Sequence, residues 1–210
     1  MSRDVSIKVA SRCCRKGKAE VRVRILSYNQ SHAPLHQQND ILGHSVRAFY
    51  LITAAADLGG KFLDDAHRLW TDAVDRKMYV TGGFGSEPRV SGCSSIVPYP
   101  RAELCSLQWE GFSEFPYHLP VSIKEGGCYA ETCASIAAMM TSERLLYHNL
   151  NGKVRDTMEL CLYNAVLGGG DLAGKAFSYE NRLATYGEES ALRADWFEGE
   201  SAVSGRSEDL

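Results

Sequence analysis

The chain has 210 residues, of which 44% are hydrophobic and 23% are charged, and its formal net charge is −3. This length fits one domain with a substantial core, or at most two small domains, in an ordinary globular protein. The balanced charge gives no reason to expect nucleic acid or a membrane surface as a partner, and no apolar run approaches the roughly 20 residues that span a bilayer.

The N-terminal segment differs from the rest of the chain. Residues 1–24 hold eight Lys and Arg against two acidic residues, and no apolar stretch follows Met1. We interpret residues 1–27 as a basic, poorly ordered segment, with a phosphate-binding arm as the alternative. The seven cysteines are odd in number and never spaced Cys-x-x-Cys. This usage argues against a disulfide framework and a simple zinc finger, and it favours a reducing, cytoplasmic location.

Two helices are predicted after residue 39. The first follows the capping residues Asn39-Asp40, runs to Asp57 with apolar residues at three- and four-residue spacing, and ends at Gly59-Gly60. The second helix carries one apolar face, formed by Phe62, Ala66, Leu69, Trp70, Ala73 and Val74. Because the link between the helices is short, we expect an antiparallel helical hairpin.

The middle of the chain interrupts the helical period. Met78–Gly85 is predicted to form a short extended piece that runs into a tight turn, because two β-forming residues precede three glycines. Residues 87–108 mix prolines, serines and cysteines without any period. We interpret them as an irregular insertion, which is unusually long for a loop inside a compact domain.

Helical periodicity returns over Tyr129–Tyr147 and again over Val154–Leu167, where three glycines stop the second helix. Phe177–Glu180 is predicted to be a short strand, and residues 199–210 are predicted to be a disordered tail. Successive helical hairpins indicate an all-α toroid or bundle.

The densest group of chemically active side chains is Glu131-Thr-Cys133. A carboxylate and a thiolate are both zinc ligands. On a regular helix, however, residues i and i+2 point about 200° apart, so the backbone would have to be non-helical here, with the helix starting near Ser135. The alternative is a helix N-terminus that carries a favourable acidic residue and a buried free cysteine.

Two further residues are candidates for chemistry. Glu110 lies between Trp109 and Phe112 in sequence, and burial against aromatic rings raises a carboxyl pKa and suits a general acid. Its alternative is an exposed loop glutamate. His44 lies near a helix start, where a structural histidine is the alternative to a ligand-binding one.

Together these segments, in this order, resemble glycoside hydrolase family 127 over about residues 28–198. The segments that carry the resemblance are His32–Pro34, Gly43–Leu51, Lys77–Gly83, Trp109–Phe112, Cys128–Ser135, Glu159–Val166 and Gly174–Phe177. The resemblance implies an incomplete (α/α)6 barrel built of helical hairpins. It also implies release of β-L-arabinofuranose, from an arabinofuranoside or related glycan, with retention of configuration.

The resemblance further implies a cysteine nucleophile held on zinc, in place of the usual second carboxylate. Glu110 matches the general acid, Glu131 and Cys133 match two zinc ligands, and His44 matches a substrate-contacting histidine. The family's other two zinc-ligand cysteines, one of them the nucleophile, follow a Trp-Phe pair. Here no cysteine follows Trp196-Phe197.

The sequence therefore predicts an incomplete zinc site and an inactive chain. The alternative is a non-catalytic helical protein that binds sugar or another partner. Helix faces without neighbours also predict self-association.

Overall fold

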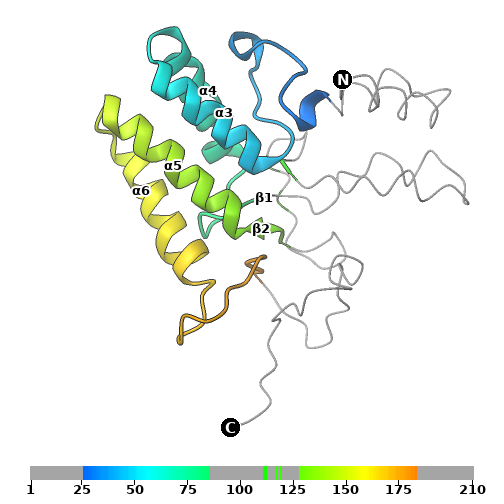
Figure 1. Cartoon of the computed structure of the whole chain (residues 1–210), viewed down its shortest axis with the longest axis vertical. Helices are drawn as coiled ribbons and strands as arrows, with labels where there is room; N and C mark the ends of the chain where they lie inside the picture. The colour runs from blue at the N-terminus through cyan, green and yellow to red at the C-terminus, as the bar shows by residue number, and fades with distance from the viewer. Residues whose placement is uncertain (1–25, 86–110, 113–116, 118, 120–127, 184–210) are drawn as a thin grey trace, which may run out of the picture.

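The computed structural model describes residues 26–85, 111–112, 117, 119 and 128–183, which are drawn in colour in Figure 1. Two helical hairpins make up most of this part: α3 (Ser45–Leu58) with α4 (Lys61–Arg76), and α5 (Thr132–His148) with α6 (Gly152–Leu160). A π-helix, Cys161–Leu167, continues α6, and a 3-10 turn, Leu35–Gln37, precedes α3. A two-stranded antiparallel ladder joins β1 (Phe84–Gly85) to β2 (Ala130–Glu131). The prediction of an all-α fold built of helical hairpins is confirmed.

Helix α3 begins later than predicted. Its N-cap is His44, so the prediction that Asn39-Asp40 cap this helix is wrong. The backbone cannot be helical just before His44, because Gly43 has φ +77 and its carbonyl accepts a hydrogen bond from Phe112 N at 2.9 Å. The predicted end is confirmed, since Gly59 is the C-cap.

Helix α4 packs through the predicted apolar face. Ala66, Leu69, Trp70, Ala73 and Val74 are buried, whereas Phe62 is 37% exposed because it lies in the first turn. Trp70 Nε1 donates a hydrogen bond to Ser142 Oγ of α5 at 3.2 Å, so the indole satisfies its one donor inside the core.

Helices α3 and α5 run in the same direction. The Thr53 and Thr141 hydroxyls lie 2.8 Å apart. Ala56 lies one turn further along α3 and His148 two turns further along α5, and His148 Nε2 is 2.9 Å from Ala56 O. Alanines on both helices are fully buried, which lets the backbones approach closely. The N-termini of α3 and α5 therefore lie at the same end of the fold, beside β1 and β2 (Figure 1).

Helix α5 begins at Thr132, directly after β2. Periodicity predicts a helix from Tyr129, whereas a zinc site would need the helix to begin later, near Ser135. The structure places the start between these two residues. Ala130 and Glu131 are extended because they pair with Gly85 and Phe84.

The last predicted helix is divided into two parts. Asn151 caps α6 with its side-chain oxygen, which accepts from Lys153 N at 2.9 Å and from Val154 N at 3.3 Å. The π-helix then begins at Cys161, where the backbone of Gly82 packs closely against Leu160 and Cys161. The predicted strand Phe177–Glu180 is reduced to isolated bridges from Phe177 to Gly170 and from Glu180 to Glu131.

Residues 1–25 of the predicted N-terminal segment 1–27, the insertion 87–108 and the tail 199–210 lie outside the described residues, whereas residues 26 and 27 lie in a helical turn. Within the described part of the chain, no helix has the length and apolar character needed to cross a membrane.

Candidate active site

Glu131 lies at the centre of a small patch of extended backbone. On one side it pairs with Phe84 of β1, and on the other it bridges to Glu180. The next residue, Thr132, donates its backbone N–H to Tyr179 O at 3.0 Å. Glu131 is 0% exposed, so its carboxylate is held inside the fold by segments on both sides.

Cys133 meets this carboxylate from the first turn of α5. Its Sγ lies 3.5 Å from Glu131 Oε2. The 200° divergence expected on a regular helix does not apply, because Glu131 is extended with φ −80 and ψ 133 and only Cys133 is helical. Sequence and structure thus agree that residues 131 and 133 converge only where the backbone changes conformation.

The spacing of this pair fits zinc. Two ligands on a tetrahedral zinc, one sulfur at about 2.3 Å and one oxygen at about 2.1 Å, lie roughly 3.6 Å apart. The observed Sγ–Oε2 distance is 3.5 Å. Among residues 26–85, 111–112, 117, 119 and 128–183, no group of three or more His, Cys, Asp or Glu side chains surrounds a possible metal position. The described residues therefore bring together two side chains of zinc-ligand type and do not form a closed site.

The other two described cysteines are buried, whereas Cys133 is partly exposed. Burial raises the pKa of the Cys128 thiol to about 11 and that of the Cys161 thiol to about 12. Cys128 Sγ donates to Asn181 O at 3.5 Å, and Cys161 Sγ donates to Gly82 O at 3.2 Å. Both thiols stay protonated at neutral pH and act as weak hydrogen-bond donors, so neither is a thiolate nucleophile.

His44 stands at the N-terminus of α3, at the same end of the fold as Glu131. Its backbone N–H donates to Tyr28 O at 3.2 Å, and its ring meets the Tyr28 ring edge-on with centroids 5.6 Å apart. Nδ1 of the imidazole accepts a hydrogen bond from Arg47 N at 3.4 Å and so caps the helix. His44 is thus both a structural cap and a half-buried ring at the same end of the fold as Glu131.

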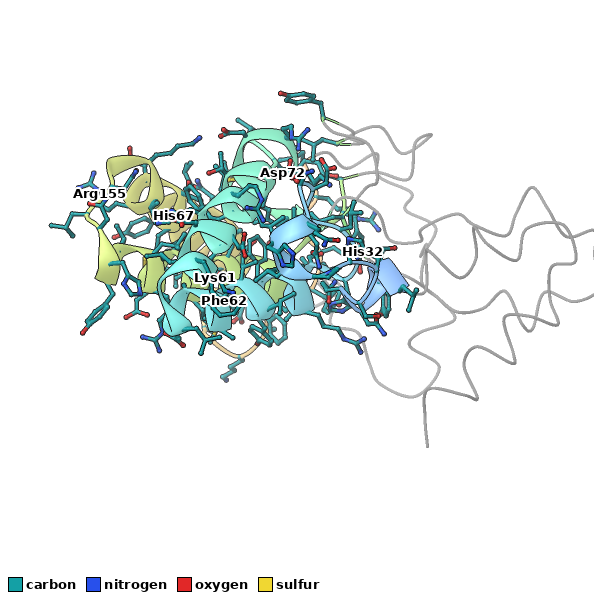
Figure 2. All side chains as sticks on the ribbon, turned by 90° about the horizontal axis from the view of Figure 1, so that it is seen from above. His32, Lys61, Phe62, His67, Asp72 and Arg155 are labelled. Atoms are coloured by element: carbon teal, nitrogen blue, oxygen red, sulfur yellow. The ribbon has the colours of Figure 1, made fainter. Side chains whose placement is uncertain are left out.

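A buried ion pair holds the loop that leads to His44. Ile41 N donates to Asp72 Oδ2 at 2.7 Å, and Lys77 Nζ donates to Ile41 O at 2.6 Å. The two charged atoms, Lys77 Nζ and Asp72 Oδ2, lie 3.8 Å apart, and both side chains are almost fully buried. In Figure 2, Asp72 lies away from Lys61 and Phe62 at the start of α4, toward the end of the fold that holds the site.

Three aromatic rings connect the His44 loop to the Glu131 ladder. Phe49 of α3 contacts Phe84 and Phe112, with ring centroids 5.0 Å and 5.6 Å away. Phe84 is the ladder partner of Glu131, and Phe112 bridges to Gly43. Glu110, the predicted general acid, lies outside the described residues. The next residue in the chain, Gly111, packs directly against the Gly43 carbonyl and His44 Cα.

The chain is similar in sequence to known proteins. A sequence model of the GH127 β-L-arabinofuranosidase catalytic domain matches residues 7–201. The chain belongs to this family. A non-reducing end β-L-arabinofuranosidase of Bifidobacterium longum is 32% identical over 164 residues, which are 76% of this chain and 21% of that protein. The GH127 chain thus spans about a fifth of the length of this curated relative.

Solved structures of the same family share the fold. A GH127 β-L-arabinofuranosidase from Geobacillus stearothermophilus T6 matches with a TM-score of 0.62 and 30% identity, over 89% of this chain and 29% of that one. A GH127 β-arabinofuranosidase matches with a TM-score of 0.61 and 25% identity, over 89% and 28% of the two chains. A third structure, a glycoside hydrolase, matches with a TM-score of 0.64 and 28% identity, over 92% and 34%.

Sequence reasoning missed two residues that hold the loop before His44. Asp72 and Lys77 were not singled out, although Asp72 interrupts the apolar face of α4 between Leu69 and Ala73. Charged residues on an otherwise buried face are rarely tolerated without partners. That signal could have marked Asp72, but its partner, the backbone of Ile41, is visible only in the folded chain.

Proposed function

We propose that this chain contributes the sugar-binding and acid side of a zinc-dependent GH127 glycoside hydrolase that acts on β-L-arabinofuranosides or related glycans. The observation that carries the proposal is the contact between Glu131 and Cys133. Glu131 is fully buried, and its Oε2 lies 3.5 Å from Cys133 Sγ. The same 3.5 Å contact is an S–H···O hydrogen bond when no metal is bound, and both side chains are of a type that ligates zinc.

In this proposal Glu131 and Cys133 hold one half of a tetrahedral zinc site. Bound zinc would keep a coordinating cysteine deprotonated at neutral pH, which makes it a nucleophile. Glu131 is suited to such a site because the backbone of β2, paired on both sides, fixes its position before any ligand arrives.

Glu110 is the proposed general acid and His44 the proposed sugar contact. Support for placing them together comes from the chain on either side of them. Phe112 N donates to Gly43 O at 2.9 Å, and Gly111 packs on the same carbonyl, so the residues adjacent to Glu110 and His44 touch. A carboxyl group near aromatic side chains would keep its proton until the leaving oxygen takes it.

We further propose that these 210 residues do not complete the catalytic centre alone. No cysteine follows Trp196-Phe197 in the sequence, and Cys128 and Cys161 are protonated hydrogen-bond donors. The chain should therefore bind the sugar without turning it over.

Hydrolysis of an aryl β-L-arabinofuranoside with zinc supplied tests this proposal. The chain is compared with a version extended by the cysteine-rich segment that the resemblance implies after Trp196-Phe197. We expect turnover only in the extended version, and turnover that is lost in Glu110→Gln. Full activity in the chain as it stands would overturn the incomplete centre. Sugar binding without turnover in both versions would favour a non-catalytic binding protein instead.

Metal binding is measured separately from activity. Equilibrium dialysis with Zn²⁺, and absorption of a Co²⁺ complex, report on the donor pair directly. Glu131→Gln and Cys133→Ser should each weaken binding by about tenfold or more, since even outer-shell partners of zinc are worth roughly 10–100-fold. Cys161→Ala is the matched control, because its thiol bonds to Gly82 and should leave metal affinity unchanged. Equal affinities in all variants would contradict the zinc assignment.

A further inference from the structure

We propose that Asn181 is a positioning residue, which fixes the point where α5 begins and thereby brings Glu131 to Cys133. The role of Asn181 toward a metal rests on the proposed function. Its role in positioning the start of α5 rests only on the contacts that it makes in the folded chain.

Local sequence does not decide where α5 begins. Apolar periodicity predicts a helix from Tyr129, yet the first helical residue is Thr132. With a start one turn earlier, positions 131 and 133 would point about 200° apart. Contacts from outside the helix therefore hold the chain before Thr132 in its extended form.

The segment 179–181 binds the backbone on both sides of position 131. Thr132 N donates to Tyr179 O at 3.0 Å, and Asn181 N donates to Ala130 O at 2.8 Å. In a longer helix these two groups would instead bond to carbonyl and amide groups four residues away. Because both groups already have partners in the segment 179–181, the helix cannot extend toward Tyr129 without losing these bonds.

The side chain of Asn181 reinforces this arrangement. Its Nδ2 donates to Thr132 Oγ1 at 2.9 Å and to Ala130 O at 3.4 Å. The Thr132 hydroxyl in turn donates to Ser178 O at 2.7 Å, and the Asn181 carbonyl accepts from Cys128 Sγ at 3.5 Å. One asparagine thus contacts residues 128, 130 and 132, and it uses both N–H groups of its amide.

Gly169 leaves the space that Asn181 occupies. Gly169 is buried, and a Cβ there would lie 2.7 Å from Asn181 Oδ1, so the asparagine would have to shift. At the neighbouring Gly170, the nearest atom to an added Cβ is Leu167 O, at an ordinary 3.5 Å. Gly169→Ala therefore displaces Asn181 without changing it, and Gly170→Ala is the matched control.

Hydrogen exchange followed by NMR tests the positioning in the metal-free whole chain. The reporter is the Thr132 amide, and its exchange is expressed relative to the Leu145 amide in the buried part of α5. Asn181→Ala and Gly169→Ala should each speed this relative exchange by about fivefold, the usual worth of one hydrogen bond. Gly170→Ala should leave it unchanged.

Metal binding tests the consequence for the Glu131–Cys133 pair, with Zn²⁺ and Co²⁺ as probes. Asn181→Ala and Gly169→Ala should weaken binding by about tenfold, as outer-shell changes at zinc sites do. The thiolate-to-cobalt absorption band at saturating Co²⁺ should also decrease, because the thiol and the carboxylate no longer meet one ion.

Two variants control for a general loss of stability. Thr157→Val removes a buried hydroxyl that donates to Lys153 O at 2.9 Å within α6, and it should melt lower than the wild type. Like Gly170→Ala, it should keep the wild-type metal affinity and cobalt spectrum.

The two measurements separate the possible failures. Unchanged relative exchange of Thr132 in Asn181→Ala would overturn the positioning role. Faster exchange with unchanged metal affinity would overturn the role toward the metal. A wild-type chain that binds neither metal would overturn the proposed zinc site and the metal role with it, while the exchange result would still decide the positioning role.

Discussion

Position 131 shows how much can depend on the backbone of one residue. Glu131 is the last extended residue before α5, and Cys133 is the second helical one. Had the helix begun one turn earlier, the two side chains would have pointed apart and could not have shared a ligand. The zinc proposal therefore depends on the pairing of β2 with β1 and Glu180 as much as on the identity of the two residues.

The buried thiols give a pH prediction at the same scale. Burial raises the pKa of Cys161 from 9.0 to about 12, so the unfolded chain releases this proton first as the pH rises. Stability from this group is fully present below pH 9.0 and declines between pH 9.0 and about 12, with a limiting slope near 1.4 kcal/mol per pH unit. Urea unfolding between pH 8 and 10 should show a shallower loss in Cys161→Ala than in the wild type; parallel curves would contradict the assignment.

At the scale of the element, helix α4 completes a hairpin and also holds the loop that precedes α3. Three charged residues one turn apart, Arg68, Asp72 and Arg76, face the loop before α3. Arg68 donates to Leu35 O and Gln38 O at 3.1 Å and 3.0 Å, Asp72 accepts from Ile41, and Arg76 pairs with Asp40. This row ties an irregular loop to a regular helix, and the loop ends at His44.

Loss of the buried ion pair between Asp72 and Lys77 should destabilise the fold. Lys77→Met removes the hydrogen bond to Ile41 O and one of the two cations beside Asp72, while Arg76 remains paired with that carboxylate, so the change should cost about 1–3 kcal/mol. Urea denaturation measures the change in the free energy of unfolding. The double variant Asp72→Asn, Lys77→Met should be more stable than the sum of the single effects, because it leaves no buried charge unpaired.

An exposed ion pair is the matched control. Lys153 pairs with Asp75, and both side chains are about half exposed. Lys153→Met should change stability by no more than about 1 kcal/mol, since water and salt screen such a pair. If Lys77→Met were as mild as Lys153→Met, the loop before His44 would not depend on the buried pair.

The turn before β1 gives a second prediction at this scale. Gly82 has φ +80, and a Cβ there would lie 2.8 Å from the backbone at Leu160 and Cys161. Gly82→Ala should destabilise the fold by about 1–3 kcal/mol through strain and overlap. Gly152→Ala is the control, because nothing lies within 4 Å of a Cβ at the first residue of α6. It should be neutral or stabilising by up to about 1 kcal/mol, and thermal unfolding that reversed this order would refute the packing of Gly82 on the π-helix.

For the whole molecule, one face of α5 stays uncovered in the described structure. Ile136, Met140 and Tyr147 are 41%, 46% and 84% exposed and lie on the same side of the helix. The chain spans about a fifth of the length of its curated relative. An apolar stripe of this kind favours association between copies.

We expect sedimentation velocity to show concentration-dependent association that is reduced in the double variant Ile136→Glu, Met140→Glu. Leu150→Glu is the control, because Leu150 is 89% exposed but lies in the link between α5 and α6. Equal association of all three proteins would exclude the α5 face as the contact, and a monomeric wild type would exclude self-association altogether.

The sequence by itself determined the helices, the hairpins and the family. Apolar spacing predicted α4 and its buried face, and glycines predicted the end of α3, because these signals depend only on neighbouring residues. The ordered motifs likewise indicate GH127 from the sequence alone. Local signals could not determine where α3 begins, because a hydrogen bond from Phe112 to Gly43 decides it.

Tertiary structure alone decided how the candidate site is assembled. The conformation of Glu131 is set by Phe84 and Glu180, which are distant in sequence. The position of His44 depends on Asp72 of α4 and on Lys77, the C-cap residue of that helix. Whether two donors converge on one ion depends on backbone directions that only these long-range contacts fix. The sequence could therefore name Glu131, Cys133 and His44 as candidates, but only the folded chain brings Glu131 to Cys133 and fixes the direction of the His44 ring.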